Sequence, residues 1–145
     1  MVHALELLHR ALIPQGILVD LRPARRPPPG RRSGAFPQIY GGSGHRRVHA
    51  GHLQPLKPLA DHRAADDAVQ TVIRRGLFSL EATAAFPFVF YFASLGHFDK
   101  AVAVRWTDTA VPAATRRRLA SLIRESPASQ IIAVEHVDLR IMRRG

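Results

Sequence analysis

Four of the eight histidines fall in one short segment, and they are the first candidates for chemistry. His45, His49, His52 and His62 lie within 18 residues. Neutral imidazoles are common zinc ligands, and water can complete a site with three protein ligands. However, no His-Glu-x-x-His sequence is present, and on a strand His49 and His52 would point to opposite faces. We therefore expect no metal site, and we interpret these histidines as partly exposed strand and loop residues.

A glycine-rich run follows Tyr40, with the sequence Gly41-Gly42-Ser43-Gly44. A phosphate-binding loop needs a lysine and a Ser or Thr next to its glycines, between a strand and a helix, and this run has neither the lysine nor that context. A nucleophile elbow would need glycine where His45 stands. The run is better interpreted as a flexible loop.

Acidic residues occur at two places where a strand is expected. Asp20 lies near the end of an apolar run, where functional side chains emerge in α/β sheets. Arg22 follows two residues later on the same face, so an ion pair with Arg22 is the favoured interpretation of Asp20. Glu135, His136 and Asp138 could take part in acid–base chemistry. No nucleophile accompanies them, so we expect polar positions at a sheet edge and no catalytic residue.

Arginines form the one concentrated charge feature. Guanidinium groups bind phosphates in a bidentate manner, and Phe36 and Tyr40 are candidate stacking partners for bases. A solvated basic loop is the alternative. The candidate anion-binding residues are Arg22, Arg25, Arg26, Arg31, Arg32, Arg46 and Arg47.

Composition limits the classes of protein to consider. The chain has 145 residues, 46% of them apolar, and a net charge of +10. It has no cysteine, which excludes disulfides and thiolate chemistry and fits a reducing compartment. The N-terminus lacks the basic region of a secretory signal, and no apolar stretch approaches the ~20 residues of a membrane helix. These features favour a cytoplasmic protein with one domain over residues 1–145. The charge fits an anionic partner or an arginine-rich composition without functional meaning.

Hydrophobic periodicity predicts an α/β order of elements. Helices are expected over 2–12, 61–75, 94–104 and 113–124. Strands are expected over 17–21, 86–92 and 131–142, with a further short strand over 48–53. The run Ile17 to Leu21 is apolar almost throughout, which is typical of a strand buried on both faces of a parallel sheet. Residues 24–47 are expected to form a basic Pro/Gly-rich loop or a partly disordered segment.

The N-terminal residues carry a resemblance. The stretch His3 to Pro23 joins an amphipathic helix, Pro14-Gln15-Gly16 and an apolar strand. It resembles the fourth helix and fifth strand of a class I S-adenosylmethionine-dependent methyltransferase, where Pro-Gly-Gly is frequent and Gln15 here replaces the first glycine. Arg75 to Phe78 resembles the turn before the sixth strand. Phe86 to Leu95 then resembles that sixth strand, and Val134 to Arg143 resembles the seventh, which inserts antiparallel beside the fifth.

The resemblance implies an α/β three-layer fragment with a small mixed sheet, similar to the C-terminal half of a Rossmann-like methyltransferase fold. The first four strands have no counterpart, and with them the glycine-rich loop and the acidic residue that hold the cofactor. The resemblance therefore implies a half-domain that is not independently catalytic, and no cofactor unless a partner supplies the missing half. Three origins would explain such a half-domain: a truncated reading frame, a split protein that needs a partner, or a repurposed half-domain. We expect a homodimer or a protein partner at the sheet edge; the alternative is a basic binding module for nucleic acid or an acidic protein.

Overall fold

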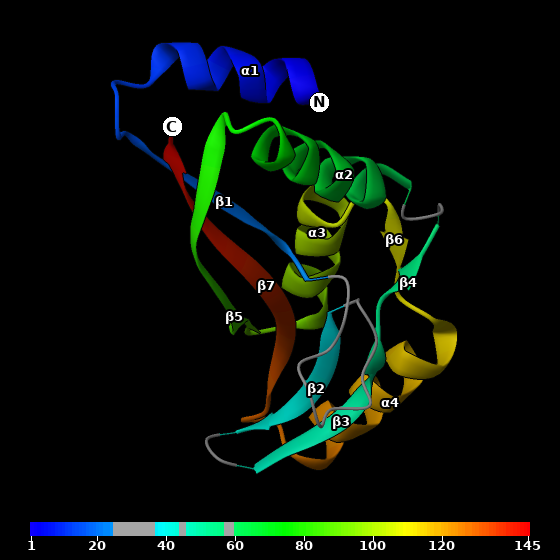
Figure 1. The fold of residues 1–145 in the computed structure, drawn as a ribbon. Helices are drawn as coiled ribbons and strands as arrows, with labels where there is room; N and C mark the ends of the chain where they lie inside the picture. Colours follow the sequence, from blue (N-terminus) through cyan, green and yellow to red (C-terminus); the bar gives the residue numbers. More distant parts are fainter. Residues whose placement is uncertain (25–36, 44–45, 57–59) are drawn as a thin grey trace. The chain divides into compact units, whose positions relative to one another are not determined.

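The protein is described here by a computed structural model that covers residues 1–24, 37–43, 46–56 and 60–145. Among the described residues, strands β1 to β4 lie between the first two helices, and from α2 onward helices and strands alternate (Figure 1). Their bounds are α1 (Val2–Ala11), β1 (Ile17–Pro23), β2 (Gln38–Ser43), β3 (Arg46–His52), β4 (Gln54–Pro55), α2 (Ala60–Arg74), β5 (Phe78–Phe92), α3 (Leu95–Arg105), β6 (Thr109–Ala110), α4 (Ala113–Glu125) and β7 (Gln130–Arg144). The predicted α/β class and the four predicted helices are confirmed.

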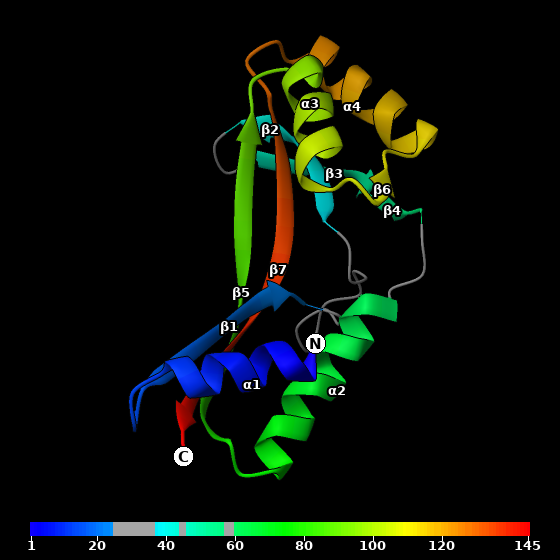
Figure 2. The same ribbon diagram turned by 90° about the horizontal axis from the view of Figure 1, so that it is seen from above.

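The chain forms two compact units. Unit 1 comprises Met1–Ala24, Leu59–Phe86 and Val137–Gly145, and unit 2 comprises Arg25–Pro58 and Pro87–His136. Strands β5 and β7 each contribute one part to either unit. The ladders of β7 with β1 and with β2, and that of β2 with β3, are antiparallel. β5 also pairs with β7, and Figure 2 shows the two strands running in opposite directions. The sheet is therefore mostly antiparallel, whereas the sequence predicted a mixed one.

Unit 1 places α1 and α2 on one face of a sheet made by β1, β7 and β5. Its core contains Val69 and Val72 of α2, Phe78 of β5 and Met142 of β7, all buried. Leu5 and other apolar residues of α1 pack against this cluster. The apolar face of α2 therefore contacts the sheet, whereas Leu8 of α1 is 44% exposed and lies outside this cluster.

Strand β1 differs from its prediction. It pairs only with β7 among the described residues, in antiparallel register, with Val19 opposite Ile141. Leu18 packs into the core, but the side chains of Ile17, Val19 and Leu21 are exposed by 51%, 57% and 53%. The prediction of a parallel strand buried on both faces is wrong, because the apolar run belongs to an edge strand that has one open face.

Unit 2 joins β2, β3 and the remaining parts of β7 and β5 with α3 and α4. Its core combines Ile39 of β2, Ile131 and Ala133 of β7, Phe98 of α3 and Leu119 of α4. The short strands β4 and β6 form a separate antiparallel pair. Among the described residues of unit 2, α3 and α4 pack on the same face of the sheet.

Two predicted helix signals are confirmed. The Ser94 hydroxyl accepts a hydrogen bond from the backbone N–H of His97 at 3.2 Å, so Ser94 is the N-cap of α3. Gly76 follows the end of α2 with φ +71°, a conformation that favours glycine. Among the described residues, no helix combines the length and the apolar composition needed to cross a bilayer.

The predicted loop over 24–47 is wrong for part of its length. Residues 38–43 form β2, and 46–47 begin β3. A Cβ added to Gly41 would lie 2.9 Å from Cδ1 of Leu122 in α4. Gly41 is thus a packed strand residue, where the absence of a side chain lets the helix approach. Residues 25–36 and 44–45 of the predicted loop lie outside the described part of the chain.

Candidate functional site

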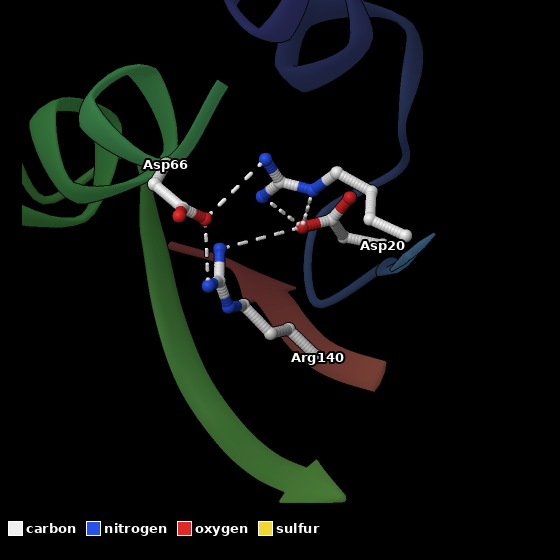
Figure 3. Close-up of polar contacts among 4 residues, drawn as sticks. Asp20, Asp66 and Arg140 are labelled. Atoms are coloured by element: carbon white, nitrogen blue, oxygen red, sulfur yellow. Dashed lines mark hydrogen bonds and ion pairs between the residues drawn. The ribbon is translucent and has the colours of Figure 1, made fainter. Parts of the chain in front are cut away.

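A cluster of four charged side chains lies on the helix-covered face of unit 1. Asp20 and Arg22 come from β1, Arg140 comes from β7 and Asp66 comes from α2. The β1–β7 register places Asp20 directly opposite Arg140. Figure 3 shows Asp20, Asp66 and Arg140 pointing toward one another from the three elements.

Within this cluster, each acid contacts both arginines. Arg22 Nε donates to Asp20 Oδ2 at 2.9 Å, and Arg22 Nη1 lies 3.5 Å from Asp66 Oδ1. Arg140 Nη2 donates to Asp66 Oδ1 at 2.8 Å, and its Nη1 lies 3.7 Å from Asp20 Oδ2. The expected ion pair between Asp20 and Arg22 is confirmed.

Chemically, this cluster is balanced. Two carboxylates face two guanidinium groups, so their formal charges cancel. Guanidinium groups do not exchange protons near neutral pH, and they stabilise the ionised form of a neighbouring carboxylate. The arrangement ties β1, β7 and α2 together, and it lacks the acid and base of a hydrolytic site. We assign it a structural role.

Glu135 of β7 also takes part in packing. Trp106, buried at the end of α3, donates from Nε1 to Glu135 Oε1 at 3.3 Å. Phe90 contacts the Trp106 ring edge-on, and Arg105 lies over the Phe90 ring at 4.5 Å. Glu135 is thus tied to the core of unit 2, not placed at a sheet edge as expected.

On the other face of unit 1, one ion pair shifts the pKa values of both its partners. Arg143 Nε lies 3.1 Å from Glu81 Oε1. The hydrogen bond and the positive charge of Arg143 lower the pKa of Glu81 below its usual value of 4.5. The same pairing raises the pKa of Arg143. The contact joins β5 to β7 at an exposed position.

The histidine prediction needs a correction. The β2–β3 register pairs Tyr40 with His49 and Gln38 with His52, with a bulge between Ile39 and Tyr40. Since Gln38 and Tyr40 share a face of β2, the bulge also brings His49 and His52 to one face. His49 Nε2 lies 3.0 Å from Gln38 Oε1. In the part of the chain that the structure describes, no three His, Asp or Glu residues gather as metal ligands. His45 and the side chain of His62 lie outside that part.

The sheet face of unit 2 that α3 and α4 leave uncovered carries aromatic and basic side chains. Arg47 of β3 donates from Nη2 to the Tyr91 hydroxyl at 3.1 Å, and its guanidinium lies 6.0 Å from the Tyr91 ring centre. Tyr40 and His49 meet edge-on, with ring centres 5.3 Å apart. Tyr40 was considered a stacking residue from the sequence, whereas Tyr91 was not singled out.

The seven candidate anion-binding arginines divide into three groups. Arg22 belongs to unit 1 and is neutralised by Asp20 and Asp66. Arg46 and Arg47 are exposed on β3 of unit 2. The remaining four, Arg25, Arg26, Arg31 and Arg32, lie outside the described residues. Arg22 thus differs from Arg47, which has no carboxylate partner among the described residues.

Asp66, Arg140 and Tyr91 are the residues that sequence reasoning missed. Arg140 lies in the strand predicted over 131–142, and the antiparallel pairing implied by the resemblance could have brought it to Asp20. Asp66 gave no signal, because its contact depends on how α2 lies on the sheet. Tyr91 alternates with the buried neighbours Phe90 and Phe92, and that period of two was a usable signal.

Comparison of the chain with protein-family models, with curated proteins and with solved structures gives no significant match.

Proposed function

We propose that this chain is a methyltransferase-like half-domain that lacks the cofactor-binding half and has no catalytic activity of its own. The observation that supports this most is the order of elements in unit 1, which is α1, β1, α2, β5 and β7. β7 lies between β1 and β5 and runs antiparallel to β1. This is the position and direction that the resemblance implies for the last strand.

The turn between α1 and β1 is also consistent with the resemblance. Gln15, at the position where the family frequently has glycine, has φ +63°. This left-handed conformation favours glycine and is unusual for glutamine. The backbone at Gln15 thus has a conformation that favours glycine, at the position where the resemblance implies one.

The proposal includes assembly through β1. In the complete family domain the fifth strand has neighbours on both sides, whereas β1 pairs with β7 alone among the described residues. An antiparallel pairing of β1 with a second copy, centred on Val19, would place Ile17 opposite Leu21 of that copy. The exposed apolar side chains of both edges would then form one continuous surface. We therefore propose a homodimer that extends the sheet.

Titration calorimetry with S-adenosylmethionine tests the proposal that the chain alone is inactive. We expect no saturable binding by the purified chain, with a complete methyltransferase domain as the positive control. The physical reason is that no residue of the chain corresponds to the glycine-rich loop and the ribose-binding acid. A micromolar dissociation constant would contradict the proposal.

A second candidate function is a basic binding module for nucleic acid or an acidic protein. The observation in its favour is Arg47, which is exposed and has no carboxylate partner among the described residues. Retention on heparin that falls steeply with salt would be expected of such a module, because binding to a polyanion releases counterions.

A further inference from the structure

We infer that the exposed side chains of Tyr91 and Arg47, on the face of the unit 2 sheet opposite α3 and α4, bind single-stranded nucleic acid, with Tyr91 as a stacking surface and Arg47 as a phosphate contact. The inference deepens the second candidate function by naming its surface and its ligand. It does not depend on the methyltransferase resemblance.

Exposure is the first argument. The Tyr91 side chain is 54% exposed although it lies on a strand whose neighbours Phe90 and Phe92 pack against the core. A tyrosine in this position loses apolar contact with the protein and offers its ring to solvent. Stacking of a base on such a ring is favourable for every base, because each base has a π face.

The position of the cation is the second argument. Arg47 is paired across the ladder with Gly42, and Gly42 is paired with Gln130 of β7. Since Gly42 has no side chain, the Arg47 guanidinium can extend over β2 and reach the Tyr91 hydroxyl. Among the described residues, this hydrogen bond uses Nη2 alone, and the other N–H groups of the guanidinium are further donors for a phosphate. A stacking ring and a phosphate donor are therefore held side by side.

Charge complementarity is the third argument. The described acids of unit 2 are Asp99, Asp108, Glu125 and Glu135, and none belongs to β2, β3 or β5. Glu135, on β7, points to Trp106 on the helix-covered side. The exposed residues of β3 on the face opposite the helices are Arg47, His49 and His52. A phosphate chain would meet attraction and no opposing carboxylate among the described residues of this face.

A single strand fits this face better than a duplex. In a duplex the bases are stacked on each other and their faces are inaccessible to Tyr91. In a single strand the bases can turn outward and lie on Tyr91 and Tyr40, while the backbone follows Arg47. An acidic protein would use the arginine but would gain nothing specific from the exposed rings.

The test measures fluorescence anisotropy of a labelled single-stranded oligouridylate, a matched duplex and heparin, each with the full chain. Tyr91→Ala should weaken binding of the single strand by about tenfold, the loss expected when one stacking ring is removed. Tyr91→Phe should retain most of the affinity because the ring remains. Arg47→Ala should weaken binding more than Arg117→Ala, which removes the same charge from exposed α4.

Each outcome decides the inference. Preference for the single strand, with loss in Tyr91→Ala and retention in Tyr91→Phe, would support it. Equal binding of single strand, duplex and heparin, indifferent to Tyr91, would overturn the stacking surface and leave only a general basic module. Equal losses in Arg47→Ala and Arg117→Ala would overturn the phosphate contact. Absence of binding to all three ligands at low salt would overturn both the inference and the module.

Discussion

Arg140 Nη2 of β7 donates a hydrogen bond to Asp66 Oδ1 of α2 at 2.8 Å. The two residues are 74 positions apart in the sequence, and their contact fixes α2 to the sheet. Both side chains are largely buried, with exposed fractions of 21% for Arg140 and 24% for Asp66. Loss of one partner would leave the other charge poorly solvated.

Asp66→Asn should therefore lower the free energy of unfolding by roughly 1–3 kcal/mol, the usual cost of removing one partner of a mostly buried, charged hydrogen bond. Asp67→Asn changes the next residue of the same helix, which is exposed, and serves as the matched control. Urea unfolding of both variants measures the difference. Equal stabilities of the two variants would contradict a structural role for the cluster.

Gln15→Gly should stabilise the protein by about 0.5–1 kcal/mol, because glycine adopts a positive φ without the steric cost paid by residues with a Cβ. Gln15→Ala is the control, since alanine keeps the Cβ and should give no gain. Thermal unfolding followed by circular dichroism gives both values. A gain with alanine equal to that with glycine would refute the strain at this turn.

Gly51→Ala should destabilise unit 2 by about 2–4 kcal/mol, combining overpacking and an unfavourable φ. Gly51 has φ +150°, and a Cβ there would lie 2.1 Å from Oγ1 of Thr115 in α4. Gly96→Ala in α3 is the control, since the nearest atom to its Cβ would be 4.0 Å away. Partial recovery in the double variant with Thr115→Ala would locate the clash. A Gly51→Ala variant as stable as wild type would show that the bulge does not pack in this way.

The ion pair of Glu81 and Arg143 predicts a dependence of stability on pH. The folded pKa of Glu81 is lowered, so its contribution is present above the usual value of 4.5 and is lost as the pH falls through the lowered folded pKa. Glu81→Gln should remove this part of the acid sensitivity. Melting temperatures of wild type and variant, recorded between neutral and acidic pH, should converge as the pH falls. A difference that stays constant or grows in acid would contradict the pairing.

The helices and the last strand could be predicted from the sequence because their apolar residues repeat with a clear period. Which faces of a strand are buried is harder to predict from the sequence. Ile17 to Leu21 is apolar except for Asp20, yet composition alone does not distinguish a strand buried on both faces from an edge strand with one open face. Gly41 and Gly42 have the composition of a loop, and only the close approach of Leu122 to Gly41 shows why glycine occurs in a strand.

The candidate surfaces depended even more on tertiary structure. The Asp20–Arg22 pair was predictable because the partners are two residues apart on one strand. The contacts of Asp66 with Arg140 and of Arg47 with Tyr91 connect distant positions, 74 and 44 residues apart, and no local spacing predicts them. The bulge at Ile39 and Tyr40 also reversed the expected orientation of His49 relative to His52, because one additional residue in β3 changes which side chains share a face.

The proposed dimer depends on the edge of β1 that pairs with no other strand among the described residues. Two variants of β1 test this dimer with different clarity. Leu18→Lys should disrupt both folding and association, because Leu18 packs into the core of unit 1. Val19→Lys is more informative, since Val19 is 57% exposed and a lysine there can remain solvated in the monomer. A charge on an edge strand opposes pairing with another strand. Val19→Lys should therefore dissociate the dimer and leave the circular dichroism spectrum unchanged.

Sedimentation velocity of the full chain at micromolar concentration tests the central claim most directly. We expect wild type to sediment as a dimer and Val19→Lys as a folded monomer, because a lysine at this edge opposes the proposed pairing of β1 with a second copy. A wild-type chain that sediments as a stable, folded monomer would contradict the account.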